Sequence, residues 1–195
     1  MSMADLFGTP SDPGLPPGLR YEPRLIPRDE AAGLVSVISD LPFEAFQFHR
    51  FTGKRRVVSF GWKYDFSAQR LEAIEPIPQF LLPLRSRAAL FGGLSGDALE
   101  QVLVTEYQAG AAIGWHKDKA VYDEVIGISF GASCTMRFRR PQGRSWERRN
   151  VVLEPGSAYI ITGESRSEWE HSIPPVEALR YSVTFRSLQK RRGPT

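Results

Sequence analysis

Residues 105–118, TEYQAGAAIGWHKD, end on a histidine and an aspartate that stand two positions apart, His116 and Asp118. In an extended backbone, positions i and i+2 point to the same side, so both side chains can reach one metal ion. The H-x-D spacing is common by chance and carries little weight alone. A further histidine, His171, lies far downstream and can complete a set of three ligands.

Two histidines and one carboxylate are the ligands of the facial triad in non-haem Fe(II) oxygenases, which leaves coordination positions open for a co-substrate and O₂. We therefore take His116, Asp118 and His171 as a candidate Fe(II) site. The segment that follows His171 strengthens this interpretation.

Residues 180–186, RYSVTFR, alternate as a half-buried strand does. The odd positions are apolar and are expected to pack a core, whereas the even positions are polar and begin and end with Arg180 and Arg186. The two arginine side chains would leave a gap of roughly 6–8 Å, which suits a five-carbon dicarboxylate. The planar guanidinium binds both oxygens of a carboxylate. The alternative is a solvated strand face with two surface arginines.

Together these residues resemble the AlkB family of Fe(II)/2-oxoglutarate dioxygenases, whose pattern is H-x-D, a distal histidine and R-x5-R. Residues 107–110, YQAG, are similar to the Tyr-x-x-Gly of the family. Residues 163–171, GESRSEWEH, are similar to the segment that leads into its second iron histidine. The resemblance covers about residues 50–187 and is specific as a combination.

The resemblance implies a role for each of these residues. Fe(II) would bind His116, Asp118 and His171, which are then the catalytic residues. 2-Oxoglutarate would chelate the iron and pair its distal carboxylate with Arg180, and O₂ would take the remaining position. The other residues expected in the co-substrate pocket are Tyr107, Arg186, Thr105 and Ser182.

Three positions depart from the family pattern. Thr105 and Ser182 stand where asparagines are common, and their hydroxyls can still form hydrogen bonds. Members that repair methylated bases often carry an acidic residue two positions after the H-x-D aspartate, and this position is Ala120 here. The third departure concerns the substrate rather than the chemistry.

The composition predicts a single globular domain of 195 residues with a net charge of +3. This mild positive charge permits an anionic partner. The one cysteine, Cys134, excludes an internal disulfide and is compatible with a reducing compartment. No apolar run approaches the length of a membrane span, and the N-terminus has no signal-peptide pattern. We therefore expect a cytoplasmic monomer without membrane contact.

The order of elements predicts an α+β fold. Residues 1–23, rich in proline and glycine, are expected to form an irregular arm before a single domain at 24–189, and 190–195 a basic tail. Helices are expected at 28–41 and 77–90, the second kinked by Pro83, and the chain after residue 124 reads as short strands. The resemblance implies a double-stranded β-helix, or jelly roll, buttressed by the N-terminal helices.

Residues 46–66 mix basic and aromatic side chains in two expected strands, with a turn at Gly53. Such a mixture suits nucleic acid, because cations contact phosphates and aromatic rings stack on bases. The alternative is an amphipathic hairpin with a solvated face. In the AlkB family this region corresponds to the nucleotide-recognition lid, so the expected substrate-binding residues are Trp62, Tyr64, Arg55 and Lys54. The loop at 139–149, with five arginines, is a further candidate for a polyanion.

Three functions remain open at this point. The first is oxidative dealkylation of alkylated nucleobases in DNA or RNA, by hydroxylation of the N-alkyl group. The second is the same dioxygenase chemistry on a protein, lipid or small molecule, which Ala120 favours. The third is a non-catalytic jelly-roll binding module, which has no need of an arginine pair behind the metal motif.

Overall fold

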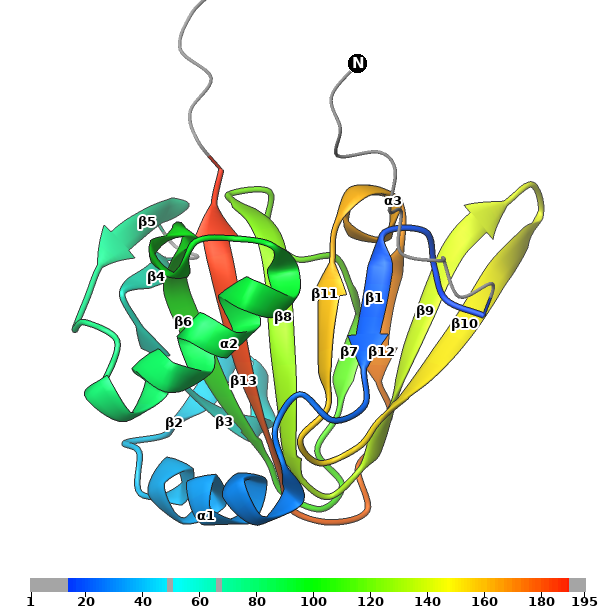
Figure 1. Cartoon of the computed structure of the whole chain (residues 1–195). Helices are drawn as coiled ribbons and strands as arrows, with labels where there is room; N and C mark the ends of the chain where they lie inside the picture. The colour runs from blue at the N-terminus through cyan, green and yellow to red at the C-terminus, as the bar shows by residue number, and fades with distance from the viewer. Residues whose placement is uncertain (1–13, 49–50, 66–67, 190–195) are drawn as a thin grey trace, which may run out of the picture.

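The computed structural model describes residues 14–48, 51–65 and 68–189 (Figure 1). The expected tail at 190–195 and most of the expected arm lie outside this range. In the described part, the larger sheet has seven strands in the order β1-β11-β8-β13-β6-β3-β2. Their bounds are β1 Leu19–Glu22, β2 Glu44–Phe48, β3 Phe51–Phe60, β6 Leu99–Tyr107, β8 Tyr122–Gly131, β11 Ala158–Ile161 and β13 Arg180–Leu188.

A smaller sheet in the same described range has four strands in the order β10-β9-β12-β7. Its strands are β7 Ile113–His116, β9 Cys134–Gln142, β10 Ser145–Leu153 and β12 Glu170–Ile173. Strands β4 Trp62–Asp65 and β5 Arg70–Ala73 form a separate hairpin. The helical segments are α1 Arg28–Ser39, η2 Gln79–Leu81, α2 Leu82–Gly92, η3 Gly96–Ala98 and α3 Gly163–Ser167.

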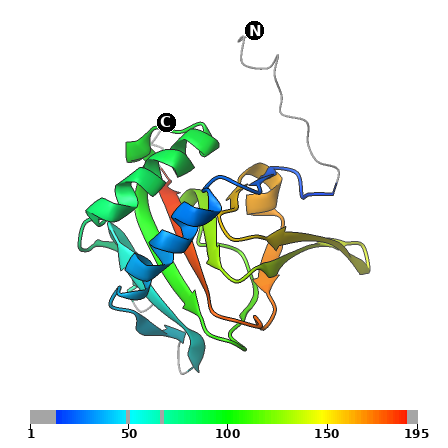
Figure 2. The same ribbon diagram turned by 60° about the horizontal axis from the view of Figure 1, so that its bottom comes forward.

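The larger sheet is covered on both faces. Helices α1 and α2 lie side by side over one face, as the two views in Figures 1 and 2 show. A core containing Ile38, Ala88, Val104 and Ile128 fills the space beneath them. A second core, with Tyr107, Val125, Met136 and Phe138 among its members, lies between the two sheets. The fold is therefore the double-stranded β-helix that the resemblance implied, with helices buttressing its larger sheet.

Strand β13 divides its side chains between these two cores. Tyr181, Val183 and Phe185 are buried in the helix-facing core, as the alternation predicted. The even positions, from Arg180 to Arg186, therefore face the interior of the jelly roll, because successive side chains alternate across a strand. This places a polar row at the centre of the molecule.

Both expected helices are present, with different bounds and with a correction at Pro83. Helix α1 ends two residues before the expected position, and its Ile38 is fully buried. The second expected helix begins later, as a 3-10 turn followed by α2, and Pro83 stands in the first turn of α2 instead of kinking it. Proline fits there because the first amides of a helix have no intrahelical acceptor. No helix in the described ranges is long and apolar enough to cross a membrane.

Three segments differ from the expected strands and loops. Residues 19–22, inside the expected irregular arm, form β1 and pair with β11. Gly53 lies within β3 and not at a turn. The long strand expected over 56–66 is instead broken at Gly61, which has φ +79° and no room for a Cβ against the Glu100 carbonyl. Because of this break, Trp62 and Tyr64 belong to β4, which pairs with β5 in a separate hairpin.

The arginine-rich segment at 139–149 is the tip of the β9–β10 hairpin and not a loop. Several of its guanidinium groups are already engaged. Arg139 pairs with Glu170 at 2.7 Å, and Arg140 contacts Glu147, Glu164 and Glu168 within 3.0 Å. These contacts tie the hairpin to the segment of α3, and they leave less free charge for a polyanion than the sequence suggested.

Candidate active site

The two histidines of the H-x-D…H pattern meet across adjacent strands of the smaller sheet. His116 ends β7 and lies directly opposite His171 on β12. Their ring centroids are 4.3 Å apart. The Nδ1 atom of His116 is 2.8 Å from the carbonyl oxygen of Gly114, so the tautomer with a proton on Nδ1 donates there and leaves Nε2 as the ligand atom.

Asp118 completes the group from the loop after β7. Its Oδ2 atom is 3.5 Å from His171 Nε2, and its Oδ1 atom accepts a hydrogen bond of 3.1 Å from Arg186. Burial opposes ionisation of this carboxyl, but the positive Arg186 and the two imidazoles outweigh burial and lower its pKa to about 2. The carboxylate is therefore charged at neutral pH.

The protonation states of the three groups suit a metal ion. Burial lowers the pKa of His171 to about 3, and burial also lowers the pKa of His116, so both imidazoles are neutral at pH 7. Neutral imidazole and ionised carboxylate are the forms that bind metal. In the described residues no three such side chains already stand in coordination geometry. The chemistry of the donor set nevertheless fits Fe(II).

Arg166 holds the backbone of the loop that carries Asp118. Its guanidinium donates to four carbonyl oxygens, those of Asp118 at 3.1 Å, Lys119 at 2.5 Å, Tyr122 at 2.9 Å and Asp123 at 3.2 Å. Lys117 adds a contact of 2.6 Å to the carbonyl of Ser167. Helix α3 therefore joins the H-x-D loop to the chain that leads into His171. The local sequence gave no sign of this role.

Arg180 is a buried cation that has no carboxylate partner among the residues that the structure describes. It is 1% exposed, and it donates one hydrogen bond of 3.1 Å to Ser129 Oγ. Its Nε and Nη1 atoms have no acceptor in the described part of the chain. The Tyr107 ring lies 4.7 Å from its guanidinium carbon. An unpaired buried guanidinium is costly in free energy, so this group is well prepared for a carboxylate ligand.

Arg186 lies at the other end of the polar row, beside the metal motif. Besides Asp118, it contacts Gln101 Oε1 at 3.0 Å, and its Nε is buried without an acceptor in the described residues. Thr105 and Ser182 are cross-strand partners between the two arginines and are both buried. The structure thus brings the expected co-substrate residues onto one face of the larger sheet.

The side chains of Arg55 and Lys54 lie in different environments, although the two residues are neighbours in sequence. Arg55 is half-buried, pairs in register with Tyr107, and stacks its guanidinium 3.9 Å from the Phe46 ring centroid. It also forms a side-chain hydrogen bond with Tyr107. Arg55 therefore faces the interior by its register, and its expected contact with the substrate stays a prediction. Lys54 is exposed, as a phosphate contact requires.

The aromatic pair of the expected lid lies on β4. Tyr64 lies near the loop that carries Asp118: the ammonium group of Lys119, the next residue of that loop, is 5.1 Å from the centroid of the Tyr64 ring. Trp62 shares that face of β4 by strand alternation and is half-buried opposite Ala73. Lys63 is exposed on the other face. The hairpin therefore reaches the neighbourhood of Asp118.

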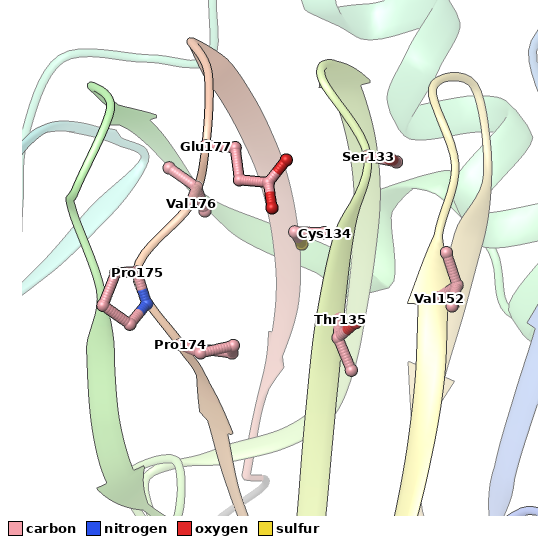
Figure 3. Close-up of a pocket in the computed structure, with 8 residues that line it drawn as sticks. All are labelled: Ser133, Cys134, Thr135, Val152, Pro174, Pro175, Val176 and Glu177. Carbon is pink, nitrogen blue, oxygen red and sulfur yellow. The ribbon is translucent and has the colours of Figure 1, made fainter.

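A separate hollow of about 240 Å³ lies elsewhere in the jelly roll (Figure 3). Residues 133–135, residues 174–177 and Val152 line it. Figure 3 shows the Glu177 carboxylate directed from its segment toward β9. None of the three candidate metal ligands lines this hollow, so it is distinct from the site described above.

The paired sheets, the His/Asp/His group and the buried arginine define a jelly-roll oxygenase that uses a metal and a carboxylate co-substrate. The family model described as the 2OG-Fe(II) oxygenase superfamily matches residues 41–191, and the chain belongs to this superfamily. The superfamily uses Fe(II) and 2-oxoglutarate, as the sequence predicted. Curated relatives show that the chain is AlkB-like.

One of these relatives is the mouse tRNA (carboxymethyluridine(34)-5-O)-methyltransferase ALKBH8, 30% identical over 83% of this chain and 25% of the mouse protein. Another is the Arabidopsis thaliana alkylated DNA repair protein ALKBH8 homolog, 27% identical over 70% of this chain and 47% of the plant protein. The chain therefore spans between a quarter and a half of these relatives.

Solved structures support the same fold. OsALKBH1 matches with a TM-score of 0.68 and 15% identity, over 89% of this chain and 98% of that chain. An oxidoreductase of the 2OG-Fe(II) oxygenase family from Burkholderia pseudomallei matches with a TM-score of 0.62 and 19% identity, over 88% of this chain and 84% of that chain. At these identities the likeness concerns the fold alone.

Proposed function

We propose that this chain removes alkyl groups from nucleobases of DNA or RNA by hydroxylating the N-alkyl carbon. The observation that carries the oxidative part is the buried guanidinium of Arg180, which has no acid partner in the described residues. It lies on the inner face of the larger sheet, the face from which Arg186 contacts Asp118 of the His/Asp/His group. The nucleic-acid part is supported by relatives named for tRNA and for repair of alkylated DNA. The β4–β5 hairpin, which carries Trp62 and Tyr64, lies beside the loop that holds Asp118, and this placement agrees with a DNA or an RNA substrate.

In this proposal His116, Asp118 and His171 hold Fe(II). Arg180 binds the distal carboxylate of 2-oxoglutarate through its Nε and Nη1 atoms, which have no acceptor in the described residues, and the ring of Tyr107 fixes the plane of the guanidinium. When bound, iron and 2-oxoglutarate supply the oxidation of a substrate C–H bond by O₂. The other residues expected against 2-oxoglutarate are Arg186, Thr105 and Ser182.

The protein's own part is to position and to shield. Arg186 donates one hydrogen bond to Asp118 Oδ1 and another to Gln101 Oε1, which holds its guanidinium in place. The Asp118 carboxylate therefore stays ionised and keeps its orientation. The apolar core between the sheets, which includes Phe138 and Ile173, limits the entry of water behind the metal ligands.

A base must leave its stack to reach such an interior site. The enzyme would therefore act on a single strand or flip the base out of a duplex. Trp62 and Tyr64 offer a stacking surface, and Lys54 offers an exposed cation for the backbone. After hydroxylation, an N-methyl group leaves as formaldehyde and the base regains its N–H.

A succinate-release assay with a panel of alkylated and etheno-adduct oligonucleotides tests this function. We expect at least one modified oligonucleotide to raise succinate formation well above the rate with the unmodified strand, together with loss of the adduct by mass. The His171→Ala variant should show neither. Succinate formation that no oligonucleotide changes would contradict the nucleic-acid substrate.

A second candidate is the same chemistry on a protein, lipid or small molecule. It is favoured by Ala120, since an exposed alanine stands where base-repairing members often carry an acid. Basal succinate formation that rises with a peptide or metabolite extract, and not with any oligonucleotide, would support it.

A further inference from the structure

Arg55 belongs to the interior of the site by strand register. On β3 it lies opposite Tyr107 of β6, and Tyr107 stacks on Arg180. Its neighbour Arg56 points to the other face, where it forms a bidentate pair with Glu106 at 2.8 Å. The two adjacent arginines therefore serve different sides of the sheet, and only Arg55 shares a side with the metal group.

The charges on this inner face do not balance. The guanidinium groups are those of Arg55, Arg180 and Arg186, and the carboxylate that faces them in the described residues is Asp118. The groups that interact electrostatically with Arg55 are Tyr107, Arg186 and His116, and none of them is a carboxylate. Fe(II) and 2-oxoglutarate carry opposite charges of equal size, so their binding leaves the excess unchanged.

Asp118 and the distal carboxylate already have their own arginines. Arg186 bonds Asp118, and Arg180 is the buried partner for 2-oxoglutarate. In the described residues no carboxylate therefore offsets the charge of Arg55, which lies near enough to His116 of the metal group for the two to interact. Position 120, where base-repairing members of the family often carry an acid, is an alanine.

We propose that Arg55 is a specificity-determining residue, which makes the site select uncharged or anionic bases and reject bases that alkylation has made cationic. This inference rests on the proposed function. A cationic base such as 3-methylcytosine would meet a like charge in a partly desolvated place, where repulsion is strong. A neutral base such as 3-methyluracil has the same shape and offers carbonyl oxygens, which accept hydrogen bonds from a guanidinium.

The size of the effect follows from Coulomb's law. Two unit charges about 8–10 Å apart at an effective dielectric constant of ~20 change an affinity by roughly 15- to 30-fold. Screening by salt and by water at the mouth reduces this value. We therefore expect the preference for 3-methyluracil over 3-methylcytosine to fall by about tenfold when Arg55 loses its charge.

The test compares two oligonucleotides that differ only in one base, 3-methylcytosine or 3-methyluracil. Affinity is measured on protein loaded with Mn(II) and 2-oxoglutarate, and turnover on protein loaded with Fe(II). The wild type should bind and turn over the 3-methyluracil oligonucleotide in preference to the 3-methylcytosine one. The ratio of the two values should fall by about tenfold in Arg55→Gln. It should be largely kept in Arg55→Lys, which retains the charge. Lys63→Gln removes the same charge from the exposed face of β4 and should leave the ratio unchanged.

Each other result has a defined meaning. An unchanged ratio in folded Arg55→Gln, judged by its melting temperature, would overturn the assignment. A weaker 2-oxoglutarate affinity with an unchanged ratio would also overturn it, because Arg55 would then serve the co-substrate. If neither oligonucleotide is turned over, the dealkylation proposal fails, whereas the binding ratio still decides the role of Arg55.

Discussion

His116 and His171 lie directly opposite one another on neighbouring strands, with ring centroids 4.3 Å apart. This pairing is a matter of strand register, so a slip of one residue would move one imidazole to the outer face. The register is supported nearby by Phe138, which lies opposite His171 on β9 and is fully buried. The two histidine ligands are therefore positioned by the packed sheet, whereas Asp118 comes from the loop after β7.

The first prediction concerns the co-substrate. Arg180→Lys keeps the charge but loses the planar guanidinium that binds both carboxylate oxygens. The KM for 2-oxoglutarate should therefore rise by roughly 10- to 150-fold, the equivalent of ~1.5–3 kcal/mol. Succinate release at varied 2-oxoglutarate measures it. Arg87→Lys, which alters a surface pair with Glu30, is the matched control. Equal impairment of the two variants would show that Arg180 is not the clamp.

The second prediction concerns Arg166. Arg166→Lys cannot reach four carbonyl oxygens at once, so the loop carrying Asp118 should loosen and Mn(II) affinity should fall by ~10-fold or more. Arg140→Lys disturbs α3 through Glu164 and Glu168 without touching that loop, and it serves as the control. If both variants lose metal affinity equally, the cause is general loosening of α3 and not the clamp on the loop.

The third prediction concerns the aromatic hairpin. Trp62→Ala should weaken binding of an alkylated oligonucleotide by ~1–3 kcal/mol, while uncoupled conversion of 2-oxoglutarate to succinate stays nearly constant. Lys54→Ala should instead weaken binding of every sequence and flatten its salt dependence. Affinity, uncoupled turnover and melting temperature are measured on the same samples. A less stable Trp62→Ala protein with both activities reduced in proportion would make Trp62 part of the scaffold.

The fourth prediction concerns stability. The buried Glu106 carboxylate accepts bonds from Arg56 at 2.8 Å, Gln108 at 2.9 Å and Tyr181 at 3.3 Å. Glu106→Gln should lower the free energy of unfolding by about 2 kcal/mol, since bonds to charged groups are lost while Arg56 stays half exposed. Denaturant unfolding measures it. Glu72→Gln, at an exposed pair with Arg70, should change little.

The same carboxylate predicts a pH dependence. The hydrogen bonds from Arg56 lower the pKa of Glu106 in the folded state below its ordinary value of 4.5. Its contribution is therefore fully present above that value and is lost as the pH falls through the lowered pKa. Wild type and Glu106→Gln should converge in stability in acid. A difference that stays constant down to pH 2 would contradict this account.

The sequence predicted those parts that depend on local spacing. The H-x-D pair, the alternation of β13 and the helix expected at 28–41 all follow from periodicity within the sequence itself. The inward face of β13 could be read before its neighbours were known, because the apolar positions had to point toward a core. The polar positions were thereby placed in the interior.

The remaining features depend on contacts between distant segments. Nothing near Arg55 distinguishes it from Arg56, and only the register of β3 against β6 sends one to Tyr107 and the other to Glu106. Arg166 is similar, since its four acceptors lie more than forty positions away in sequence. The break of the strand at Gly61 likewise requires the close approach of Glu100.

The most direct test of the site is a calorimetric titration of the apoprotein with Mn(II), in the presence of 2-oxoglutarate. The wild type should bind one ion per chain, and Asp118→Ala should lose at least ~100-fold in affinity, because it removes a charged ligand. The melting temperature is measured on the same sample, since the substitution also leaves the buried Arg186 without its partner. His116→Ala should behave alike. Unchanged Mn(II) affinity in folded Asp118→Ala would contradict the assignment of the metal site.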